Sequence, residues 1–153
     1  MTYQGQIPTA SSAETPAQDA QAIQIKALYI EDDPINRLVV RDMLGVVGIG
    51  YEEGVDGPDG LAKLEGGEFD IVLVDLRMPG MDGLEVTRQI RARCDAKAAV
   101  PIVVITADTG SGIQQDCQDA GAQDLLLKPV AMQPLLDTIC LQVLSSNPDM
   151  EMI

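Results

Sequence analysis

Short apolar runs alternate with segments of helical periodicity along most of the chain. Runs of strand length occupy residues 25–30, 69–74, 100–105 and 125–127, and a weaker one spans residues 48–55. Helical spacing of apolar residues predicts helices at residues 58–65, 84–94 and 132–144, and a short one from residue 113 to a stop at Gly121. Another helix is predicted to start at Asp33-Pro34, and its apolar residues at this spacing are Ile35, Leu38, Val39, Met43 and Val46.

This alternation predicts the fold class. Strands that read as unbroken apolar runs are typical of a parallel sheet covered on both faces, and strand–helix alternation indicates repeated βα units. We therefore expect an α/β protein with a (βα)₅ doubly wound parallel sheet, which is a flavodoxin-like three-layer sandwich. Residues 24–146 form the predicted domain. Residues 1–23, rich in Gln, Ala, Ser, Thr and Pro, are expected to be a disordered tail or linker, and residues 147–153 a flexible C-terminus.

Composition excludes several classes of function. Acidic residues outnumber basic ones by 24 to 10, and the resulting net charge of −14 repels nucleic acid and anionic membranes. Histidine is absent, which excludes histidine-based triads, histidine metal sites and a phosphohistidine carried by this chain. The three cysteines show no metal-binding or disulfide spacing. No apolar run is long enough to span a bilayer and no secretory signal is evident, so we expect a cytoplasmic protein.

Polar residues follow four of the five predicted strands directly. Glu31 and Asp32 come after the first strand, Asp75 after the third, Thr106 after the fourth and Lys128 after the fifth. Each of them alone is explained by a turn or a helix cap. Because ligands of doubly wound sheets bind beyond the carboxyl ends of the strands, the five together predict one shared site.

The residue types in this site point to phosphoryl transfer. Three neighbouring carboxylates repel one another, and a divalent cation removes that conflict. Mg²⁺ prefers oxygen ligands and few carboxylates, and Mn²⁺ is expected to substitute for it. Lys128 and the Thr106 hydroxyl can both contact a phosphoryl oxygen. A carboxylate in these surroundings, at Asp75, can attack phosphorus and form an aspartyl phosphate.

The same segments resemble a known family. The run Tyr-Ile-Glu-Asp-Asp-Pro-Ile-Asn-Arg at residues 29–37 is similar to the acidic opening of response-regulator receiver domains (CheY-like), above all those of hybrid sensor kinases and phosphorelays. The run from Ile71 to Gly83, with Asp75-Leu76-Arg77-Met78-Pro79 at its centre, resembles the phosphorylation loop of that family nearly throughout. Residues 101–107 and the pair Lys128-Pro129 resemble its later motifs. The resemblance covers about residues 25–144.

The resemblance implies a role for each matching residue. Asp75 would accept the phosphoryl group, and Glu31, Asp32, Asp75 and the backbone carbonyl of Arg77 would hold Mg²⁺. The donor would be a phosphohistidine on a histidine kinase or a histidine phosphotransfer protein. The domain would then switch conformation to control a downstream protein or a fused output. It would be no enzyme in the usual sense, because it catalyses only its own phosphorylation and dephosphorylation.

The remaining matches concern the phosphoryl group and its readout. Thr106 and Lys128 would contact that group as catalytic residues, small Ala107 would leave room beside it, and the Lys128–Pro129 peptide bond would be cis. The family carries Tyr or Phe three residues before the lysine. This chain has Leu125 there, so it lacks the rotating aromatic side chain that reports phosphorylation.

Further expectations concern tuning, mobility and assembly. Arg77 and Asp108 lie two residues beyond Asp75 and Thr106, so they are expected to pair across the mouth of the site and set how long the phosphoryl group persists. The alternative is two exposed loop charges that contribute little. Glycines around Ser111 predict a loosely started, mobile fourth helix. The last helix is apolar beyond one face, which suggests a homodimer through it.

Three rival interpretations compete with this one. A phosphatase of the haloacid-dehalogenase type needs a second acid two residues after its nucleophile, where this chain has Arg77. A nucleotide-binding module needs a glycine-rich loop, but Gly45, Gly48 and Gly50 are irregularly spaced and follow a helix. A receiver-like scaffold that works without phosphorylation is not favoured, because all key residues are present. The sequence does not identify the kinase, the output, the phosphoryl lifetime or whether a larger kinase contains the domain.

Overall fold

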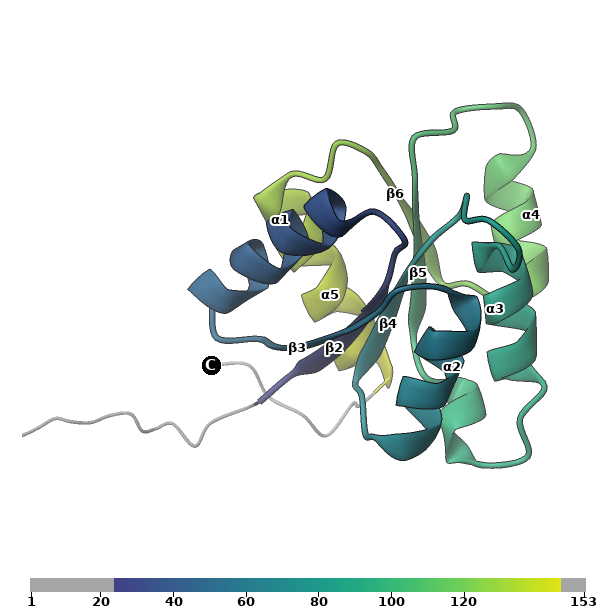
Figure 1. Ribbon diagram of the computed structural model, residues 1–153, viewed down its shortest axis with the longest axis horizontal. Helices are drawn as coiled ribbons and strands as arrows, with labels where there is room; N and C mark the ends of the chain where they lie inside the picture. The colour runs from purple at the N-terminus through teal and green to yellow at the C-terminus, as the bar shows by residue number, and fades with distance from the viewer. Residues whose placement is uncertain (1–23, 147–153) are drawn as a thin grey trace, which may run out of the picture.

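Five parallel strands form a single sheet in the order β3-β2-β4-β5-β6 (Figure 1). This computed structural model describes residues 24–146, so the predictions for residues 1–23 and 147–153 lie outside the described part of the chain. The strands are β2 Lys26–Ile30, β3 Gly50–Gly54, β4 Ile71–Asp75, β5 Ile102–Thr106 and β6 Asp124–Leu127. The chain goes from β3 across β2 to β4, so the strand order reverses beside β2. Ligands of doubly wound sheets bind at such a switch point.

Helices cover both faces of the sheet, which confirms the predicted (βα)₅ sandwich. Figure 1 shows α1 and α5 on one face and α2, α3 and α4 on the other. The helices are α1 Pro34–Val46, α2 Gly57–Gly66, α3 Gly83–Arg91, α4 Ile113–Ala120 and α5 Met132–Ser146, with a 3₁₀ turn, η2, at Ala96–Ala99. The third helix ends at Arg91, three residues before its predicted end at Cys94. Between residues 24 and 146 no helix is long and apolar enough to cross a membrane.

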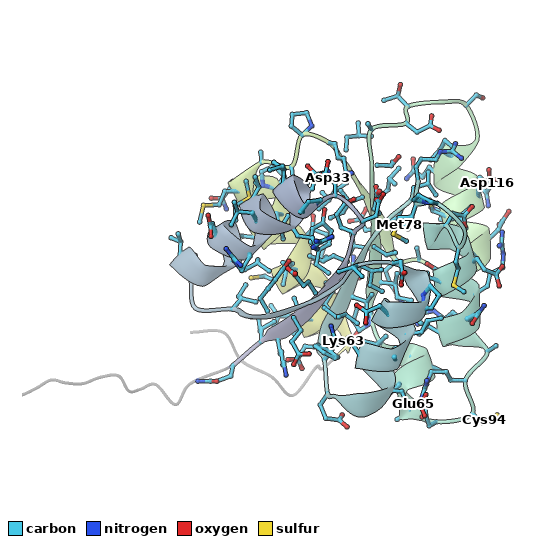
Figure 2. The ribbon with its side chains drawn as sticks, viewed as in Figure 1. Asp33, Lys63, Glu65, Met78, Cys94 and Asp116 are labelled. Atoms are coloured by element: carbon cyan, nitrogen blue, oxygen red, sulfur yellow. The ribbon has the colours of Figure 1, made fainter. Side chains whose placement is uncertain are left out.

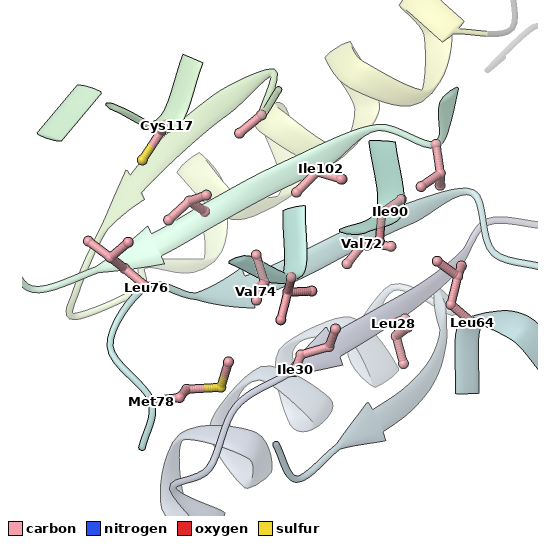
Figure 3. Close-up of a cluster of buried hydrophobic side chains, with 14 residues drawn as sticks. Leu28, Ile30, Leu64, Val72, Val74, Leu76, Met78, Ile90, Ile102 and Cys117 are labelled. Atoms are coloured by element: carbon pink, nitrogen blue, oxygen red, sulfur yellow. The ribbon is translucent and has the colours of Figure 1, made fainter. Parts of the chain in front are cut away.

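The two central strands explain why their sequences read as unbroken apolar runs. Every residue of β4 and β5 is buried, because helices pack on both sides of them. Successive side chains of a strand point to opposite faces, so Val72 and Val74 join the cluster under α2 and α3 (Figure 3). Ile71 and Leu73 join the cluster under α1 and α5. Each such buried aliphatic side chain stabilises the fold by ~1.5–3 kcal/mol.

Three helices start at the carboxyl edge of the sheet with an aspartate cap. The side chains of Asp33, Asp56 and Asp82 each accept a hydrogen bond from a backbone N–H in the first turn of α1, α2 and α3. Figure 2 shows Asp33 at this edge and Glu65 and Cys94 near the opposite one. In contrast, α4 follows Gly112, a left-handed residue (φ 87°) that provides no side-chain cap. This matches the expected loose start of α4, while its mobility stays a prediction.

The face that α1 buries is not the one marked by its most regular apolar pattern. Its fully buried side chains are Val40 and Leu44. Four of the five apolar residues at helical spacing are exposed, and we call them the α1 stripe: Ile35 (65%), Leu38 (43%), Val39 (43%) and Val46 (76%). The pattern predicted the helix correctly but marks its solvent side.

Candidate functional site

The carboxyl ends of four adjacent strands bring the predicted residues together. Glu31 directly follows β2, Asp75 ends β4, Thr106 ends β5 and Lys128 directly follows β6. These strands are neighbours in the order β2-β4-β5-β6, so their ends line one edge. Glu31, Asp75 and Thr106 are almost fully buried, with 1%, 4% and 1% of their surface exposed. Buried carboxylates need charged or hydrogen-bonding partners, and the neighbouring strands provide them.

The ammonium group of Lys128 joins two of the carboxylates. Its Nζ lies 2.9 Å from Glu31 Oε1 and 3.0 Å from Asp75 Oδ1. The peptide bond that follows, Lys128–Pro129, is cis, as expected from the resemblance. One positive charge therefore faces two buried acids. The contacts raise the pKa of Lys128 although its burial acts to lower it, so the amine is cationic at neutral pH.

The acidic residues form a group that suits a divalent cation. One carboxylate oxygen from each of Glu31, Asp32 and Asp75 lies within 4.8 Å of the other two. Asp32 is exposed, which leaves the group open to solvent on one side. Mg²⁺ takes oxygen ligands and usually keeps several waters, so a site with few carboxylates and an open side fits it. The part predicted for the Arg77 carbonyl stays a prediction.

The pKa values show which acid needs a cation most. Burial, together with repulsion from Glu31, raises the pKa of Asp75 to about 6 against the pull of Lys128. Burial and Glu31 also raise the pKa of Asp32. For Glu31, burial acts to raise the pKa, but Lys128 and the Asp33 backbone N–H outweigh it and the net pKa is lowered. Glu31 thus holds its charge firmly, whereas ionised Asp75 is destabilised until further positive charge arrives.

Two further side chains, those of Tyr29 and Asn36, hold Glu31, and neither was among the residues predicted for the site. The Tyr29 hydroxyl donates to Glu31 Oε1 at 3.0 Å, and Asn36 Nδ2 donates to the same oxygen at 3.3 Å. The backbone N–H of Asp33 donates to Oε2 at 3.2 Å. The sequence could have indicated the contact of Tyr29 with Glu31, because residues two apart on a strand share a face. Burial raises the pKa of Tyr29 far above its usual value, so its hydroxyl keeps its proton.

Arg77 and Asp108 pair beside the site, as predicted. The Arg77 guanidinium donates to the Asp108 carboxylate in an ion pair, which lowers the pKa of Asp108. Asp108 Oδ1 also accepts the N–H of Gly110 at 2.9 Å, and its own backbone N–H donates to Thr106 Oγ1 at 2.9 Å. Ala107, between Thr106 and Asp108, is exposed. The pair therefore joins the loop after β4 to the loop after β5.

Leu125 occupies an inward position on the edge strand. It is half-buried and packs against the cluster that contains Val104 and Cys117. Leu127, at the end of the same strand, is 52% exposed. The strand β6 thus offers an aliphatic side chain, not an aromatic one, at the position three residues before Lys128.

Comparison with known proteins identifies the family of this chain. The family described as "Response regulator receiver domain" matches residues 27–140, which includes the whole candidate site and every strand except the first residue of β2. The chain belongs to the response regulator receiver family. Receiver domains act in two-component signalling, and the acidic group at the carboxyl edge of the sheet is in accord with that assignment.

Curated relatives of this receiver domain are parts of much larger kinases. It is 35% identical over 135 residues to hybrid signal transduction histidine kinase L of Dictyostelium discoideum, covering 84% of this chain and 8% of that protein. It is 37% identical over 112 residues to the sensor histidine kinase RcsC of Salmonella typhi, covering 73% of this chain and 12% of that protein. The chain thus spans about a tenth of the length of these relatives.

Solved structures confirm the fold of the receiver domain. The chemotaxis protein CheY4 of Vibrio cholerae superposes with a TM-score of 0.74 at 29% identity, covering 78% of this chain and 99% of that one. The receiver domain of sensor histidine kinase PA1611 from Pseudomonas aeruginosa superposes with a TM-score of 0.72 at 31% identity, covering 79% of this chain and 98% of that one. That structure has a magnesium ion coordinated in its active site cleft.

Proposed function

We propose that this receiver domain transfers a phosphoryl group from a phosphohistidine of a partner onto the carboxylate of Asp75, with a bound divalent cation. The observation that supports this most strongly is the contact of the Lys128 amine with both Glu31 and Asp75, beside three clustered carboxylates. Mg²⁺ is the proposed cation, because the PA1611 receiver domain binds magnesium in its cleft. Mn²⁺ is expected to replace it.

The residues of the site have separate tasks in this reaction. One Asp75 oxygen forms a bond to phosphorus while the bond from phosphorus to the donor imidazole breaks, and the electron pair of that bond stays on the imidazole nitrogen. Glu31, Asp32 and Asp75 would hold the cation, which would supply positive charge to offset the charge of the transferring group. Lys128 adds a second positive charge at the same carboxylate. The Thr106 hydroxyl accepts from Asp108, so its proton is available for a phosphoryl oxygen.

A kinase or a histidine phosphotransfer protein is the proposed donor. The chain carries no histidine, so the phosphohistidine must come from another protein or another domain. The α1 stripe begins with Ile35, four residues after the metal-binding Glu31, and offers an apolar surface next to the site. We propose that the donor docks on this surface, because exposed apolar patches of this kind mark protein contacts.

Two alternatives are less well supported by the site. The residue two places after Asp75 is Arg77, and its side chain pairs with Asp108 and provides no acid for general acid–base work. We therefore propose that the domain catalyses only its own phosphorylation and dephosphorylation and does not turn over phosphate esters. The 3.0 Å contact of Lys128 Nζ with Asp75 Oδ1 also argues against a scaffold that works without phosphorylation.

The Arg77–Asp108 pair is proposed to control the lifetime of the phosphoryl group. It joins the loop that follows Asp75 at the end of β4 to the loop that follows Thr106 at the end of β5. Ala107, which is exposed and carries a single methyl group, is proposed to leave room beside the phosphoryl group. We propose that the pair hinders the approach of water to the aspartyl phosphate.

Several finer points stay predictions. A homodimer through α5 has the exposed Leu141 in its favour, and Leu127 lies exposed at the end of β6. The nature of the output is open, since Leu125 replaces the usual aromatic residue. A location in the cytoplasm is likewise expected from the sequence alone.

The proposed function is tested by incubation with acetyl phosphate and Mg²⁺, followed by intact-mass measurement. Wild-type protein should gain one phosphoryl group, and Asp75→Asn and samples with excess EDTA should gain none. Asp70→Asn serves as the matched control, because Asp70 lies at the opposite end of β4 and should leave labelling unchanged. Labelling of Asp75→Asn at the wild-type level, or repeated turnover of p-nitrophenyl phosphate, would contradict the proposal.

A further inference from the structure

We infer that Tyr29 is a positioning residue that fixes the Glu31 carboxylate for the metal ion independently of Lys128. This inference rests on the proposed function, since it assigns a task within the same site. Tyr29 is fully buried in β2, and its ring packs in the cluster between the sheet and helices α1 and α5. Its only polar atom reaches Glu31 Oε1 at 3.0 Å. A rigid ring that is fully buried in this cluster places that donor with little freedom.

The contact matters because Lys128 serves two carboxylates at once. Its Nζ is shared between Glu31 and Asp75 at 2.9 and 3.0 Å. Once Asp75 carries a phosphoryl group, that carboxylate loses its charge and new anionic oxygens appear beside it, so the amine is drawn toward them. Glu31 would then lose its strongest partner at the moment when the site still needs its cation.

Donors that stay in place when Lys128 moves keep the Glu31 carboxylate hydrogen-bonded and oriented. Tyr29 and Asn36 both donate to Glu31 Oε1, from β2 and from α1, and the Asp33 backbone N–H donates to Oε2. The Tyr29 bond is the shorter of the two side-chain bonds, 3.0 against 3.3 Å, and it comes from the more rigidly packed residue. Partners behind a metal ligand orient it, and their loss typically costs 10–100-fold in metal affinity.

A small cavity beside Tyr29 should reduce the loss of Mg²⁺ affinity that follows removal of its hydroxyl. Tyr29, Asn36 and Lys128 line a pocket of about 160 Å³ between α1 and the loop after β6. This volume is large enough for water, which can partly replace a missing hydroxyl at Glu31. We therefore expect the lower end of the usual range, a loss of about 10-fold in Mg²⁺ affinity for Tyr29→Phe.

The test is isothermal titration of Mg²⁺ into wild type, Tyr29→Phe and Tyr51→Phe. Tyr51 is the matched control on the adjacent strand β3: its hydroxyl contacts Glu53 and the Arg37 carbonyl, not a carboxylate of the site. Tyr29→Phe should bind Mg²⁺ about 10-fold more weakly, and Tyr51→Phe should match wild type. In acetyl phosphate labelling, the half-saturating Mg²⁺ concentration of Tyr29→Phe should rise by the same factor, while the rate at saturating Mg²⁺ is retained.

The outcomes separate this inference from the proposed function. An unchanged Mg²⁺ affinity in Tyr29→Phe overturns the inference, as does an equal loss in Tyr51→Phe or a lowered saturated rate with an unchanged half-saturation. Failure of wild type to bind Mg²⁺ overturns the proposed function as well. If Tyr29→Phe does not fold, Asn36→Ala provides the second variant, because it removes the other side-chain donor to Glu31 that is independent of Lys128. This variant should also bind Mg²⁺ more weakly than wild type. An unchanged Mg²⁺ affinity in Asn36→Ala would then refute the inference.

Discussion

At the scale of single residues, charge balance decides how the site works. Lys128 offsets two buried carboxylates, but the group formed by Glu31, Asp32 and Asp75 still carries more negative than positive charge. The ionised form of Asp75 is destabilised most, because burial and Glu31 raise its pKa to about 6. The residue proposed as the nucleophile is thus the one whose ionised form gains most from a cation, because added positive charge stabilises the form that attacks phosphorus.

The Arg77–Asp108 pair leads to a prediction about dephosphorylation. Arg77→Ala opens the loop contact and should shorten the life of the aspartyl phosphate, because water then reaches it more easily. An exposed ion pair is screened by solvent and contributes little, so we expect at most about a fivefold faster loss of the label. The measurement is the decay of intact-mass labelling after acetyl phosphate is removed.

The control for this prediction is Arg88→Ala. Arg88 forms a comparable exposed pair with Glu85 on α3, away from the loops in question. Its decay rate should equal that of wild type. If Arg77→Ala decays no faster than Arg88→Ala, the pair is only a surface contact and the lifetime is set elsewhere.

At the scale of elements, α1 has two different apolar faces. Val40 and Leu44 attach it to the sheet, while the α1 stripe stays in water. An exposed apolar row beside a reactive site is costly unless a partner covers it part of the time. The helix therefore combines a structural face with a face suited to binding, and its start is held in place by the Asp33 cap.

This arrangement predicts a selective defect in phosphotransfer. Ile35→Gln removes an exposed apolar side chain close to the site without adding charge. Transfer from a phosphorylated histidine phosphotransfer domain should slow by about fivefold to thirtyfold, since burying such a side chain contributes ~1–2 kcal/mol. Labelling by acetyl phosphate, which needs no docking surface, should proceed at the wild-type rate.

Val46→Gln is the matched control for Ile35→Gln. It changes an even more exposed residue of the same stripe, at the far end of α1. A helix rises 1.5 Å per residue, so the two positions are ~16 Å apart. Equal slowing by both variants would show a nonspecific loss of apolar surface, and slowing of the acetyl phosphate reaction would place the defect in the site itself.

At the scale of the whole molecule, the site weakens the fold when no metal is bound. Asp75 has a pKa of about 6 in the folded protein against 3.8 ordinarily. The folded state therefore holds a proton on Asp75 that the unfolded state releases between these values, so the contribution of Asp75 to metal-free stability should fall as pH rises from about 4 to about 6. The shift corresponds to at most ~3 kcal/mol, all of it expressed above pH 6.

Asp75→Asn should remove the loss of metal-free stability that ionised Asp75 causes. In EDTA at pH 8 the variant should unfold at higher urea concentration than wild type, and near pH 3, where both side chains are neutral, the difference should vanish. Mg²⁺ should reduce or reverse the gap at pH 8 by binding wild type. Asp42→Asn, on the exposed side of α1, is the control and should show no such dependence. A pH-independent difference between Asp75→Asn and wild type would contradict the explanation.

How much of this could be read from the sequence depends on the range of each interaction. Unbroken apolar runs predicted the central strands, because burial on both faces leaves no polar positions. Strand ends followed by Glu31, Asp75, Thr106 and Lys128 predicted the site, because parallel strands share one carboxyl edge. The α1 stripe was harder to interpret, since periodicity predicts a helix but does not say which of two apolar faces meets the sheet.

By itself, the sequence determined the order of strands and helices, the chemical content of the site and the absence of histidine chemistry. These features depend on local patterns and residue types. Only the tertiary structure decided that β2 lies between β3 and β4, that one lysine bridges two acids, and that Tyr29 and Asn36 hold Glu31. Those contacts join residues from different elements. Their geometry is set by how helices and strands pack, which no local pattern of side chains specifies.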